Sequence, residues 1–232
     1  YRLRLLHRLY PNKMYLVLTH NKPLSRDLEA RFNRLEGCSP KNIEWRTFNA
    51  WCFHHWPKHI PWVVPLFPRM RERYIHDAWQ ETLEDSSISE HMLLSEIDWL
   101  KDQNPLSQAD YLTADRRGRG FGLSAEQRQR MWSAVDVYQR MLDQQGALDW
   151  GDVPLRLWQA TQNKTVELPQ YDVVFIDEAQ FFAPLWVNLI QKAINPQNAH
   201  LFLVADPTQG FLGRKATWKS LGLDARGRSH QL

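Results

Sequence analysis

The sequence predicts an α/β protein with a parallel sheet, interrupted by an all-helical insert. Short apolar runs alternate with helical patterns in residues 1–63, which is typical of parallel strands joined by helices. Residues 64–147 show helical periodicity only, and apolar runs ending in acids return within residues 148–232. We therefore expect residues 1–63 and 148–232 to share one sheet, with residues 64–147 as a separate helical subdomain. With 43% apolar and 12% aromatic residues the chain can form a core, which excludes disordered and collagen-like classes.

The first part of the chain reads as helix, strand, helix, strand and helix. Residues 2–10 form a basic amphipathic pattern, and the continuous apolar run 14–19 predicts a strand buried on both faces. Residues 25–35 have helical spacing, residues 43–48 alternate like a strand, and a helix is expected from Asn49. This order predicts a β-α-β arrangement.

The middle of the chain begins after a proline-rich stretch, residues 57–68, which marks a boundary. Helices are expected over residues 71–83, 89–101 and 124–145, and Ser89 is a plausible N-cap. The basic, glycine-rich loop 115–122 is expected to be mobile and solvated, with contact between duplex nucleic acid and Arg116 to Arg119 as the alternative. Most tryptophans, including Trp132 and Trp158, are expected in the core.

Strand patterns return in the last part of the chain. Apolar runs at residues 171–178 and 200–206 predict two more buried strands, and a helix is expected between them over residues 184–193. No stretch approaches the roughly 18–20 apolar residues of a bilayer helix, so we expect no membrane partner.

Charge and cysteine content restrict the class of partner and the compartment. The net charge is +3, but residues 1–60 hold 11 Lys and Arg against 4 Asp and Glu, a local charge of +7. A basic first segment favours a polyanion partner, although solvated helix faces are often basic too. Two cysteines, Cys38 and Cys52, make no disulfide framework, which favours the reducing cytoplasm.

Acids that directly follow predicted strands are the strongest indication of chemistry. Asp177 and Glu178 follow one buried strand, and Asp206 follows the next, with Gln209 three residues later. Ligands bind at the carboxyl ends of parallel strands, where one carboxylate can hold a metal and the other can deprotonate an attacking water. A nearby amide can hydrogen-bond a phosphate, so this pattern favours nucleotide hydrolysis over simple solvated caps.

These residues resemble the UvrD/Rep-like helicases of superfamily 1. Residues 175–180 look like motif II of that family and residues 204–209 like motif III, and together they are the specific part of the match. Three further segments support the match. Residues 18–24 are similar to motif Ia, residues 46–52 to motif Ib, and residues 148–153 to the segment where the chain re-enters the motor domain. The resemblance implies a RecA-like sheet of the P-loop NTPase type, here incomplete, with the helical insert as subdomain 1B.

The resemblance implies an ATP-dependent helicase that moves on single-stranded DNA, with a duplex junction as a further expected partner. ATP and Mg²⁺ would be the cofactors: Asp177 would hold the metal, Glu178 would activate water, and Gln180 and Gln209 would contact the nucleotide. Strand ends and basic or aromatic positions supply the expected nucleic-acid contacts, namely Thr19, Asn21, Lys22, Thr47, Phe48, Asn49, Arg214 and Trp218. For Phe48, core packing is an equal alternative.

The chain also departs from the family pattern. It contains no Gly-x-x-x-x-Gly-Lys-[Ser/Thr] phosphate loop, and the run after Gln209 differs from the family's, which puts the stacking residue in doubt. We expect a monomeric fragment that lacks the second motor domain, binds no cofactor and is inactive by itself. A non-enzymatic nucleic-acid-binding or assembly module is the alternative. His54, His55 and His59 have no matching carboxylate or Cys neighbours in the sequence, so no metal is expected there.

Overall fold

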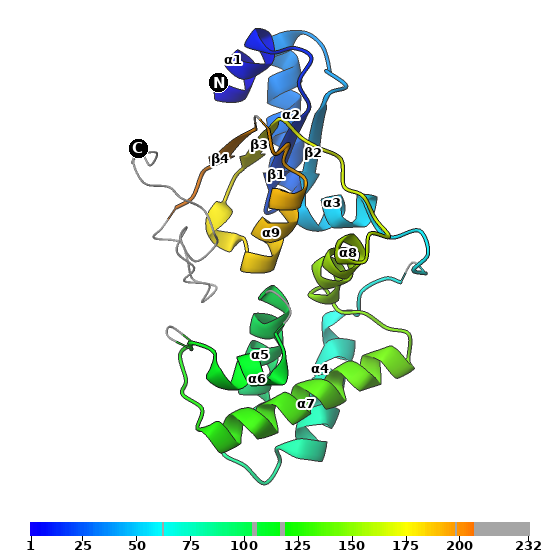
Figure 1. Ribbon diagram of the computed structural model, residues 1–232, viewed down its shortest axis with the longest axis vertical. Helices are drawn as coiled ribbons and strands as arrows, with labels where there is room; N and C mark the ends of the chain where they lie inside the picture. The colour runs from blue at the N-terminus through cyan, green and yellow to red at the C-terminus, as the bar shows by residue number, and fades with distance from the viewer. Residues whose placement is uncertain (62, 104–105, 117–118, 198, 207–232) are drawn as a thin grey trace. The chain divides into compact units, whose positions relative to one another are not determined.

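The computed structural model describes residues 1–61, 63–103, 106–116, 119–197 and 199–206 (Figure 1). Within these ranges it contains a four-stranded sheet and nine α-helices, which confirms the predicted α/β class. The chain divides into two compact units, one made of residues 1–56 and 160–232, the other of residues 57–159. The expected boundaries after residues 63 and 147 stay a prediction. None of the described helices is long and apolar enough to cross a membrane.

The sheet is entirely parallel, as the sequence predicts. Its strands are β1 (Tyr15–Thr19), β2 (Ile43–Thr47), β3 (Val173–Ile176) and β4 (His200–Leu203). They lie in the order β2-β1-β3-β4. Every residue of β1 is buried, because strands pair with it on both edges and helices pack against the sheet.

Helices on the first unit pack against the sheet through alternating strand residues. Tyr15 and Val17 of β1 share a buried cluster with Phe32 of α2 (Lys22–Glu36), and Leu3 and Leu6 of α1 (Arg2–Leu9) pack on the same cluster. Successive strand side chains point to opposite faces. Leu16 and Leu18, which are also fully buried, therefore belong to the other face.

Two further helices of this unit are joined by an aromatic contact. Phe48 begins α3 (Phe48–His54), and its ring stacks on that of Trp186 in α9 (Pro184–Lys192), with 4.4 Å between centroids. Such stacked pairs add about 0.5–1.5 kcal/mol to the burial of their surface.

Local capping explains where observed helices differ from the predicted ranges. The α2 helix begins three residues earlier than expected because the Asn21 side chain accepts a hydrogen bond from the backbone N–H of Leu24. The strand predicted over residues 43–48 ends one residue early because Thr47 caps α3 in the same manner.

Helices are the regular secondary structure of the second unit, and no strand occurs among its described residues. Its helices are α4 (Pro68–Thr82), α5 (Glu90–Asp102), α6 (Gln108–Thr113) and α7 (Ala125–Gln144), with α8 (Asp152–Gln162) running across the division between the units. The predicted cap at Ser89 is confirmed, since its side chain accepts a hydrogen bond from the N–H of Met92. Trp132 packs against the buried cluster of this unit, as expected. The short α6 was not predicted.

The prediction of a solvated basic loop is wrong for Arg116 and Arg119. Both guanidinium groups form ion pairs with Glu96, whose side chain is fully buried. Both also lie over the rings of Trp99 and Phe121. Burial and the charge of Arg119 lower the pKa of Arg116 to about 10. A buried carboxylate that needs a counter-charge, rather than solvent, therefore holds these side chains.

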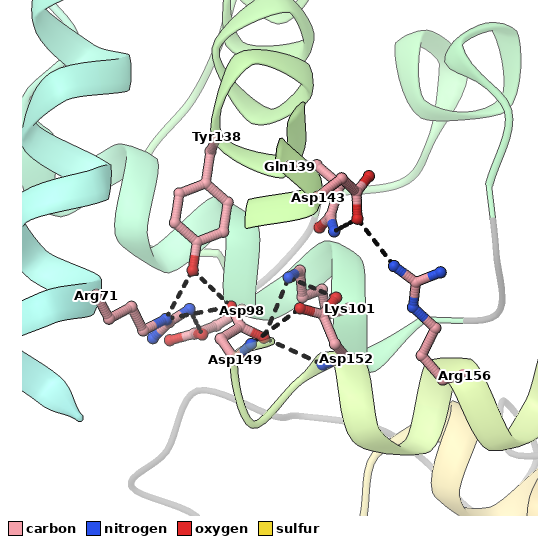
Figure 2. A network of polar contacts seen from close by, with 9 residues as sticks. All are labelled: Arg71, Asp98, Lys101, Tyr138, Gln139, Asp143, Asp149, Asp152 and Arg156. Atoms are coloured by element: carbon pink, nitrogen blue, oxygen red, sulfur yellow. Dashed lines mark hydrogen bonds and ion pairs between the residues drawn. The ribbon is translucent and has the colours of Figure 1, made fainter. Parts of the chain in front are cut away.

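A buried polar network joins four segments of the second unit (Figure 2). The Nζ atom of Lys101 lies 2.7 Å from Asp152 Oδ1 and 3.1 Å from Asp149 Oδ1. The two aspartates also accept hydrogen bonds from each other's backbone N–H groups, both at 3.0 Å. Tyr138 of α7 donates to Asp149 at 2.7 Å, and Arg71 of α4 lies 3.3 Å from it. The network thus ties α4, α5 and α7 to the start of α8.

The segment from Asp149 to Asp152 requires a glycine where Lys101 crosses it. A Cβ atom added to Gly151 would lie 2.8 Å from Cδ and 2.9 Å from Cβ of Lys101. Burial opposes ionisation of Asp149, but the positive charges of Lys101 and Arg71 outweigh it and hold its pKa below the usual value. Burial raises the pKa of Asp152, and the neighbouring Asp149 adds to this while Lys101 opposes it. Lys101 is therefore the charge on which both buried carboxylates depend.

Replacing Lys101 should destabilise the second unit strongly. We expect Lys101→Met to lower the free energy of unfolding by about 3–5 kcal/mol, because it leaves two buried carboxylates without their shared counter-charge. Urea unfolding followed by circular dichroism measures the change. Lys58→Met removes the same charge from an exposed position and should have little effect. Equal stability of the two variants would contradict the role given to Lys101.

Candidate functional site

The carboxyl ends of all four strands lie at one edge of the sheet because the strands are parallel. The register pairs Thr19 of β1 with Thr47 of β2, Leu18 with Ile176 of β3, and Ile176 with Leu203 of β4. The segments that leave these ends therefore start side by side, at the place where open parallel sheets bind ligands.

The two acids that follow β3 are held by backbone hydrogen bonds. The N–H of Asp177 donates to the carbonyl of Leu18 at 2.9 Å, which extends the pairing of β3 with β1. The N–H of Glu178 donates to Asp177 Oδ1 at 3.1 Å. Glu178 adopts the left-handed conformation, with φ 56° and ψ 40°, and the chain then turns into a short 3-10 helix, η1 (Ala179–Phe181). Both acidic side chains remain half-exposed.

Gln180 connects this turn to the segment that follows β4. Its side-chain Nε2 donates to Glu178 Oε2, and its Oε1 accepts a hydrogen bond from the backbone N–H of Asp206 at 3.0 Å. A backbone hydrogen bond of 2.8 Å, from the N–H of Ala179 to the carbonyl of Val204, lies beside it. The structure thus brings together the two acid-ended segments that the sequence singled out. Gln209 lies outside the described residues.

The electrostatics of the acid pair favour a cation. Burial raises the pKa of Asp177, the Glu178 carboxylate raises it further, and the N–H of Glu178 opposes both effects. Among the described residues neither carboxylate has an ion-pair partner. Oxygen ligands of this kind suit Mg²⁺, which commonly uses one or two carboxylates together with substrate phosphates. The donor set therefore fits that metal, with Asp177 and Glu178 as the residues able to hold it.

The polar residues expected to contact nucleic acid have local structural roles. Thr19 is fully buried and donates to the carbonyl of Asn21 at 3.0 Å. Asn21 caps α2 and Thr47 caps α3 through their side chains. Lys22, in the first turn of α2, is exposed and is the charged group of this set that can reach a phosphate.

Phe48 packs in the core, which is the alternative that the sequence left open. It is 2% exposed, and its ring contacts those of Trp51, Phe182 and Trp186. Its ring faces are therefore taken up by the protein. Asn49 is half-buried, and its side-chain oxygen has no hydrogen-bond partner among the described residues. Arg214 and Trp218 lie outside those residues.

One residue at this edge was not identified from the sequence. His20 is exposed between Thr19 and Asn21, and its ring centroid lies 4.6 Å from that of Phe181 in η1. It therefore links the end of β1 to the turn that carries the acids. Its position directly after a buried strand was the available signal.

One protein family matches most of the chain. The family described as the UvrD/REP helicase N-terminal domain matches residues 3–219 of the chain. No curated protein sequence is significantly similar to this chain.

Gln180 should determine how firmly the ends of β3 and β4 are joined. In Gln180→Ala the N–H of Asp206 loses its acceptor, so its hydrogen exchange should accelerate by about threefold to tenfold, as expected for a hydrogen bond of about 0.5–1.5 kcal/mol. Native-state exchange followed by NMR measures it. Gln170→Ala is the control, because Gln170 bonds to the carbonyl of Lys192 away from this edge. Unchanged exchange at Asp206 would show that Gln180 does not join the two segments.

Proposed function

The chain belongs to the UvrD/REP helicase family, and on that basis we propose that it forms part of a motor that couples ATP hydrolysis to movement on single-stranded DNA. The observation that carries the proposal is the arrangement of Asp177, Glu178 and Gln180 at the carboxyl edge of the sheet. This edge offers a carboxylate for a metal, a second carboxylate for a proton, and an amide that connects the second carboxylate to the segment after β4.

Each of these side chains has a proposed task in hydrolysis. Asp177 would hold Mg²⁺, and the ion would supply positive charge against the negative charge that develops on the phosphates of ATP. Glu178 orients a water molecule and accepts its proton. Gln180 fixes the carboxylate of Glu178 through the Nε2 hydrogen bond, so that its free oxygen faces the water. Gln209 contacts the terminal phosphate.

The residues proposed to grip the phosphates of ATP are not among these 232 residues. Backbone N–H groups and a lysine of a Gly-x-x-x-x-Gly-Lys-[Ser/Thr] loop usually perform this task, and the 232 residues contain no such loop. We propose that this chain by itself binds ATP poorly and does not hydrolyse it. In this proposal ATP and Mg²⁺ are cofactors of the full-length helicase.

Single-stranded DNA is the proposed partner, and it crosses the loops that follow β1 and β2. Lys22 would contact a phosphate, and the capping segments around Asn21 and Thr47 would set the path of the backbone. Arg214 and Trp218 would contribute a charge and a stacking ring. The free thiols of Cys38 and Cys52 support a reducing compartment such as the cytoplasm.

Removing the proposed base should abolish turnover and leave binding intact. In the full-length protein, Glu178→Gln should reduce ATP hydrolysis by about 10²–10⁴-fold, because it removes proton acceptance, and it should leave the affinity for ATP within a few-fold. A coupled ATPase assay with single-stranded DNA and equilibrium nucleotide binding measure the two effects.

Glu167→Gln is the matched control for this experiment. It makes the same change of charge at an exposed position that precedes the amino end of β3, whereas Glu178 follows its carboxyl end. Wild-type turnover in Glu178→Gln would refute the role of Glu178, and it would favour a non-enzymatic binding module.

Salt dependence tests the contact with DNA. If Lys22 binds a phosphate, Lys22→Gln should reduce the slope of log affinity against log salt concentration by about 0.7 for single strands. Fluorescence anisotropy of a labelled oligonucleotide at several salt concentrations gives the slope. Lys41→Gln is the control, since Lys41 is exposed before β2, at the amino end of that strand. Identical slopes for wild type and Lys22→Gln would exclude a phosphate contact at Lys22.

A further inference from the structure

Three side chains that commonly bind metals converge where α3 ends beside β2. Glu44 is the second residue of β2, His54 is the last residue of α3, and His55 is its C-cap. One ligand atom from each lies within 4.8 Å of the other two. Three ligands at about 2.0–2.1 Å from one tetrahedral ion would lie about 3.4 Å apart, so small side-chain rotations suffice to close the site.

The carboxylate that the sequence lacked is supplied by the fold. Sequence spacing pairs His55 with His59 and finds no acid nearby, whereas Glu44 precedes His54 by ten residues. The turn from β2 into α3 brings the end of the helix back beside the start of the strand. Glu44 lies near the amino end of β2, while Asp177 follows the carboxyl end of β3, so this cluster is distinct from the proposed nucleotide site.

A layer of hydrogen bonds already orients Glu44. Trp51 Nε1 donates to the hydroxyl of Tyr171 at 3.3 Å, and that hydroxyl donates to Glu44 Oε2. Arg46 donates to Glu44 Oε1. A carboxylate offers about four lone-pair sites, so both donors leave positions for a metal. Carboxylates that ligate metals are commonly held in this way by neighbouring donors.

His55 contains an unsatisfied ligand atom. Its Nε2 is buried and has no hydrogen-bond partner among the described residues. The ring is fixed by edge-on contacts, with centroids 5.2 Å from that of Trp51 and 4.9 Å from that of His54. A buried nitrogen without a partner is costly, and a metal ion would satisfy it.

We propose that Glu44, His54 and His55 bind a divalent transition-metal ion of the zinc type, with water in the fourth position. Two imidazoles and one carboxylate suit Zn²⁺ and its neighbours better than Mg²⁺ or Ca²⁺, which prefer oxygen ligands only. The ion joins the start of β2 to the end of α3. It therefore restrains the intervening residues 45–53 without taking part in hydrolysis.

Metal titration of the 232-residue chain tests this site directly. Isothermal titration with Zn²⁺ should show one ion bound per chain, and Co²⁺ should give the visible absorption of a tetrahedral complex. His54→Ala and Glu44→Gln should each weaken Zn²⁺ binding by about 100-fold or more, since loss of an outer hydrogen bond alone typically costs 10–100-fold. Tyr171→Phe, which keeps the ring and removes the donor to Glu44, should weaken it by about 10–100-fold.

A matched histidine variant separates this site from non-specific binding. His200→Ala removes an exposed histidine from β4, at the opposite edge of the same sheet, and should bind Zn²⁺ like the wild type. Because His54 is exposed, its substitution leaves the core intact, and circular dichroism verifies folding of every variant. Absence of Zn²⁺ binding in the wild type, or equal binding by His54→Ala, Glu44→Gln and His200→Ala, would overturn the proposal.

Discussion

Parallel pairing of β1 with both β2 and β3 is the constraint on which the rest of the first unit depends. β1 contributes five fully buried or nearly buried residues and hydrogen-bonds along both edges. Because its neighbours run in the same direction, every connection must cross the sheet as a helix and every strand ends at the same edge. The polar residues gathered at that edge are therefore a consequence of topology, since residues distant in sequence, such as Thr19 and Asp177, become neighbours through strand register.

Polar groups at this edge serve the fold first. Thr19, Asn21 and Thr47 satisfy backbone groups where strands turn into helices, which limits what they can offer a ligand without rearrangement. The acids differ from them, because Asp177 is half-buried and its pKa is raised, so its ionised form gains from any cation that approaches. This contrast is a physical reason to propose Mg²⁺ binding at the carboxyl end of β3 and a structural role for the polar residues at the carboxyl ends of β1 and β2.

Sequence patterns predicted the strands, the helices of the insert and the position of the acids after β3, because each of these depends on local periodicity or on where a strand ends. They could not predict the environment of Phe48, since α9, which covers it, lies more than 130 residues later. The environment of Arg116 and Arg119 could not be predicted either. Their basic, glycine-rich loop is typical of a solvated segment, but in the structure both side chains pair with the buried Glu96. Likewise, Glu44 comes close to His54 and His55 only because α3 runs back beside β2. Long-range pairing, rather than propensity, decides each of these cases.

The backbone is strained at Glu178, the residue that we propose as the base. A non-glycine residue with φ of 56° in the left-handed region costs about 1–2 kcal/mol, and Lys164 is the other such residue among those described. Lys164 is exposed in a loop, whereas Glu178 is held between a strand and a turn by the carboxylate of Asp177 and the amide of Gln180. An ordinary helical or extended conformation at Glu178 would redirect its side chain away from Gln180. The strain is thus maintained by the same hydrogen bonds that orient the carboxylate, as expected for the reactive role that we propose for Glu178.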